Sequence, residues 1–521
     1  MDKFEYVDGT LKSLDRDLKN LKKQCPCGNI AFEVIRMHGG NREGAGRKSI
    51  EDKKKPVTIY LDTEERAAIE NALLPSSSTF SQKCRELIGL GLNYLEQDAA
   101  VSSNEVRFID LFSGLGGIRL GFEQALRDRG LVGKCVFSSD IKPAAIEAYK
   151  NYFGEDPKCD ITKIEPAKLP NFDFMLAGFP CQAFSQAGLG LGFQDTRGTL
   201  FFDIAKILLE KKPKGFVLEN VEGLVSHDKG KTFKVITNTL EELGYSIQYR
   251  VLNGKHFGLA QNRNRIYIIG YRDGKVNPLE GFVTEHSALE DIIDYTVPPV
   301  NTAFTKKLLS HYTIKELYGK AIKDKRGGAN NIHSWDIGIK GEVTAEQKQL
   351  LNQLLKQRRN KKWADLIGIK WMDGMPLTEE MISSFYHNDH LHEMLIDLVK
   401  KGYLEYEYPK QLVGNKRVAD TTLEKGYNIV AGKLSFEFTK VLDPKDVTPT
   451  LVATDVHKLA VPVGEGIRPL TVKEGLKLFG FPENYDLSFL KEAEAFDLLG
   501  NTVCVPVIKA VSSKLLESCY S

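Results

Sequence analysis

One stretch of the chain joins a strand, a glycine-rich turn and a helix with no linker between them. Residues 106–112 form an apolar run typical of a buried strand, and Ser-Gly-Leu-Gly-Gly follows at 113–117. Apolar residues then recur at helical spacing up to Gly130. Glycines let the backbone approach a ligand, and a helix N-terminus favours an anionic group. The pattern predicts an α/β sheet that carries a nucleotide-like cofactor at this turn.

Two acidic residues stand at corresponding places later in the chain. Asp140 ends the predicted strand over 135–139, and Asp160 follows a predicted helix over 143–153. In nucleotide-binding folds a carboxylate at the end of the second strand can hold the ribose hydroxyls. Because the glycine turn and both acids come at strand ends, we expect them to meet at one edge of the sheet. Together they favour an adenosine cofactor.

A cysteine follows the next apolar strand. The strand covers residues 174–177, and the chain continues as Gly-Phe-Pro-Cys-Gln-Ala-Phe-Ser over 178–185. Pro180 fixes its own φ angle and disfavours the helical region for Phe179, so the chain leaves the strand in a rigid turn. Cys181 is thus predicted at the carboxyl end of a strand, where open α/β sheets place reactive groups. The alternative for a lone cysteine is a small buried hydrophobic residue.

The composition limits the classes of protein to which the chain can belong. Its 521 residues are enough for two or three domains. The eight scattered cysteines do not form a disulfide framework, and we expect neither a signal segment nor a run that spans a bilayer. The cytosol is therefore the predicted location. A net charge of +2 gives no global attraction for nucleic acid, so any such surface must be local.

Taken in order, the motifs around Phe112 and Cys181 resemble those of the DNA (cytosine-5) methyltransferase family of bacterial modification enzymes, over about residues 106–515. The resemblance implies a mostly parallel α/β methyltransferase sheet, flanked by helices, that binds S-adenosylmethionine (AdoMet). It implies that Phe112 packs on the adenine, Asp140 holds the ribose and Asp160 lies near the adenine amino group. The predicted cofactor-binding residues are Phe112, Gly114, Gly116, Gly117, Asp140, Ile141, Asp160, Ile161, Pro180 and Asn501.

The chemistry of this family explains why a cysteine is needed. Carbon 5 of cytosine is a poor nucleophile until a thiolate adds to carbon 6, which divides one hard step into easier ones. Glu219 ends an apolar strand over 215–221 and resembles the family glutamate that contacts ring nitrogen N3. Arg263 and Arg265 alternate on an extended segment, so we expect both on one face, binding the base carbonyl and nearby phosphates.

Three further residues are candidates for contact with DNA near this site. Base chemistry within a duplex requires the nucleotide to be flipped into a pocket, and the glycine-rich stretch 181–200 is the predicted lid. Gln182 and Ser185 in that stretch, and Gln261 before the arginines, are predicted to bind DNA. We name no base for the removal of the carbon 5 proton, for which water is one candidate.

The α/β pattern stops after about residue 272. The family places its target recognition domain here, and this chain has a basic run over 356–362 in which Arg358 and Arg359 are candidate DNA contacts. Thr448-Pro-Thr-Leu resembles the closing element of that domain, and Arg468-Pro-Leu-Thr resembles the motif that supports it.

The first hundred residues lie outside the resemblance. A strand over 56–61 with helices over 62–73 and 80–95 resembles a ribbon-helix-helix DNA-binding module, which acts as a dimer; a plain helical accessory domain is the alternative. Cys25 and Cys27 lack the second ligand pair of a structural zinc site, so no metal is predicted.

These observations predict an accessory domain over 1–100, a catalytic and AdoMet-binding core over 105–272, a recognition domain over 273–452 and a return to the core over 453–521. The predicted enzyme methylates cytosine in duplex DNA within a restriction-modification system, shares its target with a cognate endonuclease and works in the cytoplasm at the nucleoid, with no membrane partner. The alternatives are a tRNA methyltransferase of the same fold and a transcriptional repressor acting through the N-terminal domain.

Overall fold

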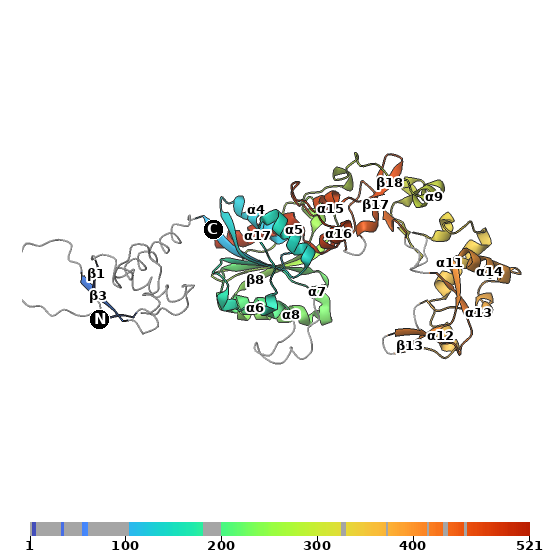
Figure 1. Ribbon diagram of the computed structural model, residues 1–521, viewed down its shortest axis with the longest axis horizontal. Coiled ribbons are helices and arrows are strands. Elements are labelled where there is room, and N and C mark those ends of the chain that lie inside the picture. The colour runs from blue at the N-terminus through green and yellow to red at the C-terminus, as the bar shows by residue number, and fades with distance from the viewer. Residues whose placement is uncertain are drawn as a thin grey trace, which may run out of the picture. The chain divides into compact units, whose positions relative to one another are not determined.

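Figure 1 shows the computed structural model of the chain. It describes residues 3–6, 33–35, 55–60, 104–180, 200–324, 330–370, 374–413, 416–430, 436–452 and 456–520. The chain divides into two compact units, Met1–Glu105 and Val106–Ser521. We describe each by itself.

The first unit contains a small antiparallel sheet. Its strands are β1 (Lys3–Tyr6), β2 (Glu33–Ile35) and β3 (Lys55–Tyr60), in the order β1-β3-β2. The strand predicted over 56–61 is thus confirmed as β3, while the helices predicted over 62–73 and 80–95 lie outside the described residues. β3 is the central strand, with β1 and β2 at its two sides. The ribbon-helix-helix module stays a prediction.

The second unit is built on a six-stranded sheet with the order β5-β4-β6-β7-β9-β8. β4 runs parallel to β6 and β6 to β7, whereas β9 runs antiparallel to both of its neighbours. The mostly parallel α/β methyltransferase sheet is therefore confirmed. The strands are β4 (Glu105–Leu111), β5 (Val132–Ser139), β6 (Phe174–Gly178), β7 (Gly215–Val221), β8 (Ser246–Asn253) and β9 (Asn264–Tyr271).

Helices cover both faces of this sheet because its strands are apolar on both sides. In β6, Phe174 and Leu176 belong to one buried cluster, and Met175 and Ala177 belong to the other. Figure 1 shows α4, α5 and α17 on one side and α6 and α8 on the other. These helices are α4 (Gly117–Arg127), α5 (Pro143–Phe153), α6 (Leu200–Lys211), α8 (Lys231–Glu242) and α17 (Val505–Cys519).

Two of the helices on the first face approach each other unusually closely. A Cβ atom at Gly121 of α4 would lie 2.6 Å from the Cβ of Ile508 and 2.7 Å from the carbonyl oxygen of Val505, both in α17. Among the described residues, only the stretch formed by α16 (Glu492–Asn501) and α17 is long and apolar enough to cross a membrane. Its most apolar 18 residues are 72% buried inside the fold. Burial of this kind is typical of core helices.

The segment between β9 and the C-terminal helices forms two further hydrophobic clusters. The first includes α9 (Ala303–His311), β17 (Leu459–Val463) and β18 (Gly466–Pro469). The second, over residues 335–429, contains its own helices and strands. These are α11 (Ala345–Gln357), α12 (Lys362–Leu366), α13 (Glu379–Ser383), α14 (Leu391–Lys401), β12 (Leu404–Glu407) and β15 (Gly426–Ile429).

The recognition domain predicted over 273–452 stays a prediction, and one observation bears on its first boundary. We expected it at residue 273, but Val276, Leu279, Leu289 and Ile293 pack in the same cluster as the catalytic sheet. The regular α/β pattern ends at residue 272 because the stretch that follows contains only one short helical turn, Leu289–Asp291. Its apolar side chains nevertheless pack with those of the sheet. The separate clusters begin only after about residue 294.

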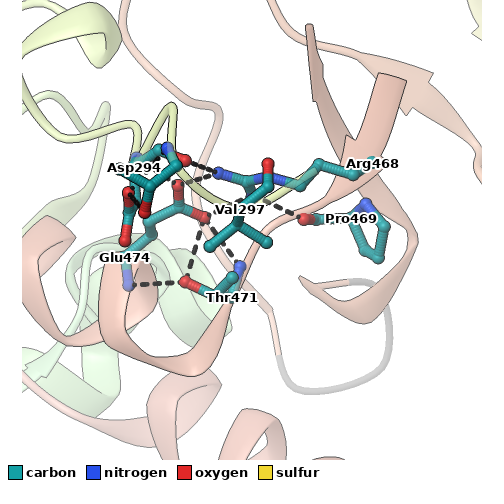
Figure 2. Close-up of polar contacts among 7 residues, drawn as sticks. Asp294, Val297, Arg468, Pro469, Thr471 and Glu474 are labelled. Carbon is teal, nitrogen blue, oxygen red and sulfur yellow. Dashed lines mark hydrogen bonds and ion pairs between the residues drawn. The ribbon is translucent and has the colours of Figure 1, made fainter. Parts of the chain in front are cut away.

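The chain passes this boundary twice, near Asp294 on the way out and near Arg468 on the way back. A buried ion pair, Arg468–Glu474, joins the two passages (Figure 2). Arg468 and Glu474 are each only 1% exposed, and the guanidinium donates to both carboxylate oxygens at 2.9 and 2.6 Å. Arg468 also donates to the carbonyls of Asp294, Val297 and Pro469. Glu474, in α15 (Val472–Leu478), accepts from the backbone N–H of Asp294 and from Thr471. We call this group of residues the crossing clasp.

Candidate active site

A cavity of about 540 Å³ lies where β4, β6 and β7 end. Open α/β sheets bind ligands at this edge. Twelve of the residues predicted from the sequence line it: Phe112, Gly114, Gly117, Asp140, Ile141, Asp160, Ile161, Pro180, Glu219, Arg263, Arg265 and Asn501.

The glycine turn shapes one wall of the cavity. Phe112 has a φ angle of 54° and Gly114 one of 52°, so the chain turns sharply as it leaves β4. A left-handed conformation at a non-glycine residue costs about 1–3 kcal/mol and marks functional sites more often than others. Asp140 fixes the turn, since its two carboxylate oxygens accept from the N–H groups of Gly114 and Lys142, both at 2.8 Å.

Gly116 has a different role from the one predicted. It is not among the residues that line this cavity, and it caps α4 with a φ angle of 71°. A Cβ atom there would lie 2.3 Å from the ring of Phe153. The glycine is therefore needed for the packing of α4 on α5, and its contact with the cofactor stays a prediction.

An acid–arginine pair forms the opposite wall. Glu219 lies on β7, paired in register with Gly178 of β6, and is 8% exposed. Its Oε1 atom lies 3.1 Å from Nε of Arg265 on β9. Burial raises the pKa of Glu219, although Arg265 and Arg263 act in the opposite direction. A buried carboxyl with a raised pKa is suited to donate a proton near neutral pH.

Arg263 differs from Arg265, although we expected both to face the base. Its side chain is buried to 1% exposure and donates to the carbonyls of Leu451, Gly500 and Thr502 at 2.8, 3.1 and 2.7 Å. Burial, together with the positive charge of Arg265, lowers the pKa of Arg263 to about 10. Its two terminal nitrogens are thus used inside the protein, while Nε has no partner among the described residues. We correct its predicted role to that of a positioning residue that ties β9 to the two segments returning to the cavity.

Comparison with known proteins agrees with this geometry. The family model for C-5 cytosine-specific DNA methylases matches residues 106–517. The chain belongs to the C-5 cytosine-specific DNA methylase family. It is thus a DNA (cytosine-5) methyltransferase and uses AdoMet as its cofactor. The match begins at residue 106, where the second compact unit also begins.

Several curated relatives match this methylase over almost their whole length. It is 57% identical over 422 residues to Type II methyltransferase M.NlaIV of Neisseria lactamica, which covers 80% of this chain and 99% of the relative. It is 56% identical over 423 residues to Type II methyltransferase M.NgoBV of Neisseria gonorrhoeae, with the same coverage. Among solved structures, S. pombe Dnmt2 methyltransferase matches with a TM-score of 0.44 and 15% identity, covering 79% of this chain and 98% of that one.

The cavity of the methylase fits an adenosine cofactor. The turn at Gly114 is open, because a Cβ atom there would meet only the carbonyl oxygen of Phe112, at 3.9 Å. Asp140 and Asp160 offer carboxylates, and hydrogen bonds from Thr162 lower the pKa of Asp160. Sequence reasoning missed Ser113, whose buried hydroxyl lines the cavity and has no hydrogen-bond partner among the described residues. Its place inside the glycine turn is the only signal that the sequence offers.

Two predicted DNA contacts of the methylase are wrong. Gln261 is fully buried, and its amide donates to the carbonyl of Leu478 at 2.9 Å. Arg358 is 6% exposed and donates to Asn428 and to the carbonyl of Ile429. Arg359 is half-buried. A basic run in a sequence does not reveal which of its side chains turn inward, and here Arg358, directly after α11, turns toward the hydrophobic cluster of residues 335–429.

Three predicted residues of the methylase lie outside the described residues: Cys181, Gln182 and Ser185. Their predicted roles stay predictions. Pro180, the residue before Cys181, lines the cavity that Glu219 and Arg265 also line.

Proposed function

We propose that the enzyme methylates carbon 5 of cytosine through a covalent adduct with Cys181, on a nucleotide flipped out of duplex DNA. The buried Glu219–Arg265 pair carries the proposal. It lines the same cavity as Pro180, the residue that precedes Cys181 in the sequence.

The residues divide the chemistry between them. The Cys181 thiolate adds to carbon 6, and the electron pair of the C5–C6 double bond becomes available at carbon 5 as N3 takes a proton from Glu219. Bound AdoMet supplies an electrophilic methyl group to carbon 5. Loss of the carbon 5 proton to a base or water then re-forms the double bond and expels the Cys181 thiolate, and N3 returns its proton to Glu219.

Arg265 assists in two ways. Its ion pair fixes the orientation of Glu219, and its remaining N–H groups can donate to the base carbonyl. Burial raises the pKa of Glu219, which favours its role as the proton donor when charge develops on the ring. Because these groups lie within a cavity, a base stacked in a duplex cannot reach them, which supports base flipping.

The biological role follows from the relatives. M.NlaIV and M.NgoBV are Type II methyltransferases, and by this likeness the enzyme methylates DNA within a restriction-modification system in the cytoplasm. We further propose a cognate endonuclease that shares its target, work at the nucleoid, and recognition of that target by residues 295–440. Because the chain is similar to these Type II methyltransferases, we favour DNA over tRNA as its substrate.

Covalent trapping tests the mechanism. Incubation with AdoMet and duplex DNA that carries 5-fluorocytosine at methylated positions should yield a denaturation-resistant adduct, since fluorine cannot leave as the proton does. Cys181→Ala should abolish the adduct, whereas Cys519→Ala, which changes a half-buried cysteine of α17, should retain it. An adduct that survives in Cys181→Ala would refute the proposal.

A further inference from the structure

A two-stranded hairpin within residues 335–429 pairs with no other strand that the structure describes. β13 (Lys410–Val413) and β14 (Lys416–Ala419) form a two-stranded antiparallel sheet of their own. All four residues of β14 are exposed, as are Gln411 and Leu412 of β13. Leu412 and Val418 are each 49% exposed, although both are apolar. The hairpin therefore projects from the fold instead of contributing to its core.

The base of the hairpin is held firmly. Asp420 accepts at one oxygen from the N–H and hydroxyl of Thr422, and at the other from the Gln411 amide. The N–H of Asp420 donates to the carbonyl of Pro409, and Lys410 pairs with Glu407 at 2.6 Å. These contacts fix the direction in which the strands leave the domain, so the ribbon is presented in a defined orientation.

The outer part of the hairpin is positively charged. Lys416 and Arg417 carry its charge, and within the described part of the chain neither side chain has an ion-pair or hydrogen-bond partner. The acidic residues nearest to them in sequence, Glu407 and Asp420, are occupied at the base. Unpaired cations beside exposed apolar side chains match a partner that combines negative charge with apolar groups.

The register places different side chains on the two faces. Leu412 is opposite Arg417, and residues directly opposite share a face. Gln411 and Val418 form the next pair, so they lie on the other face, together with Lys416. One face therefore combines a guanidinium with an apolar side chain, and the second cation projects from the opposite face.

Duplex DNA, the substrate of this family, offers a complementary site. The major groove is about 12 Å wide and admits a two-stranded ribbon. In it, arginine binds guanine by two parallel hydrogen bonds, and apolar side chains contact the thymine methyl group. We propose that the β13–β14 hairpin enters the major groove of the target, where Arg417 reads a base and Lys416 binds the DNA backbone (β13 in Figure 1). This rests on the proposed recognition role of residues 295–440.

The test uses the full-length enzyme and a pool of duplexes with randomised sequence, methylated in vitro and read by bisulfite sequencing. Arg417→Ala should relax the preference at one base position of the methylated site by about 5- to 150-fold and leave the others unchanged. Lys416→Ala should keep the site but weaken binding, lowering the slope of log affinity against log salt by about one. Lys400→Ala, which removes an exposed cation of α14, is the control and should change neither.

The results of these experiments separate failure of the hairpin proposal from failure of the covalent mechanism. An Arg417→Ala enzyme that methylates the same sites with the same preference overturns the proposal, while trapping by 5-fluorocytosine DNA still supports the covalent mechanism. Concentration-dependent dimerisation that Leu412→Ser abolishes would also overturn it, since the hairpin would then bind a second copy of the chain. Failure of the wild-type enzyme to form the trapped adduct would refute the mechanism and leave the hairpin result standing.

Discussion

Replacing Arg468 with Met would test whether the crossing clasp holds the two passages of the chain together (Figure 2). Met keeps much of the length of the side chain but removes five hydrogen bonds, two to Glu474 and three to carbonyls. Glu474 would keep the bonds from Asp294 and Thr471. The substitution therefore leaves a buried carboxylate with hydrogen bonds but without a countercharge.

The expected loss follows from this arrangement. Removing one partner of a buried ion pair costs about 3–5 kcal/mol, because the other charge remains uncompensated. Since three donors still hold the carboxylate, we expect the lower end, about 3 kcal/mol. That corresponds to a change of roughly 150-fold in the equilibrium for local opening.

The chain has more than one compact unit, so it need not unfold in a single transition. Hydrogen exchange measured by mass spectrometry is therefore the suitable assay, because it reports local opening peptide by peptide. Peptides containing Asp294 and Thr471 should exchange about 100-fold faster in Arg468→Met. Arg129→Met is the control, because its pair with Glu517 is 3.4 Å long and partly exposed, and such pairs contribute about 0–1 kcal/mol.

Two results would refute the reasoning. The first is unchanged exchange of both peptides in Arg468→Met. The second comes from the double variant Arg468→Met/Glu474→Leu, which removes both charges and should be less destabilised than Arg468→Met alone. If it is not, the uncompensated charge is not the cause of the loss.

Three further predictions concern the cavity and its support. Glu219→Gln should lower the rate of methyl transfer by about 100-fold or more. Burial raises the pKa of Glu219, so the wild type should lose stability as pH rises from the ordinary pKa of glutamate through the folded-state pKa, and the variant should not. Thermal unfolding followed from below the ordinary pKa of glutamate up to neutral pH checks this, and equal pH dependence of the two proteins would contradict it. Ser113→Ala should weaken AdoMet binding about 2- to 12-fold in calorimetric titrations, and an unchanged affinity would exclude the hydroxyl as a ligand. Gly121→Ala should destabilise the second unit by about 1–3 kcal/mol in thermal unfolding, because its Cβ would contact α17, whereas Gly223→Ala, with open space around it, should not; equal stability of the two variants would contradict the packing argument.

The sequence predicts the strands and helices of the catalytic core well, because there local pattern and burial agree. The helix over 143–153 and the strand over 215–221 coincide with α5 and β7. Both have strong end signals: a proline opens α5, and β7 is apolar until Glu219. The cavity was likewise predictable, since strand-end residues of parallel strands meet at one edge.

The errors have a common physical origin. Gln261, Arg263 and Arg358 are polar in sequence, yet each is buried and donates to carbonyls from distant segments. Nothing near Arg263 in the sequence indicates Gly500 or Thr502, which lie more than two hundred residues away. A polar side chain that satisfies backbone carbonyls of a returning segment cannot be distinguished from a ligand-binding one before the tertiary fold is known.

The packing of α17 on α4 has a consequence for synthesis on the ribosome. Gly121 meets its partner helix only after the whole segment between β9 and α15 has been translated, and Gly500–Val503 line the cavity just before α17 begins. A nascent chain that has completed all six strands of the sheet therefore still lacks one wall of its cofactor pocket. The cavity is therefore complete only after residues 295–440, for which we propose target recognition, have been synthesised.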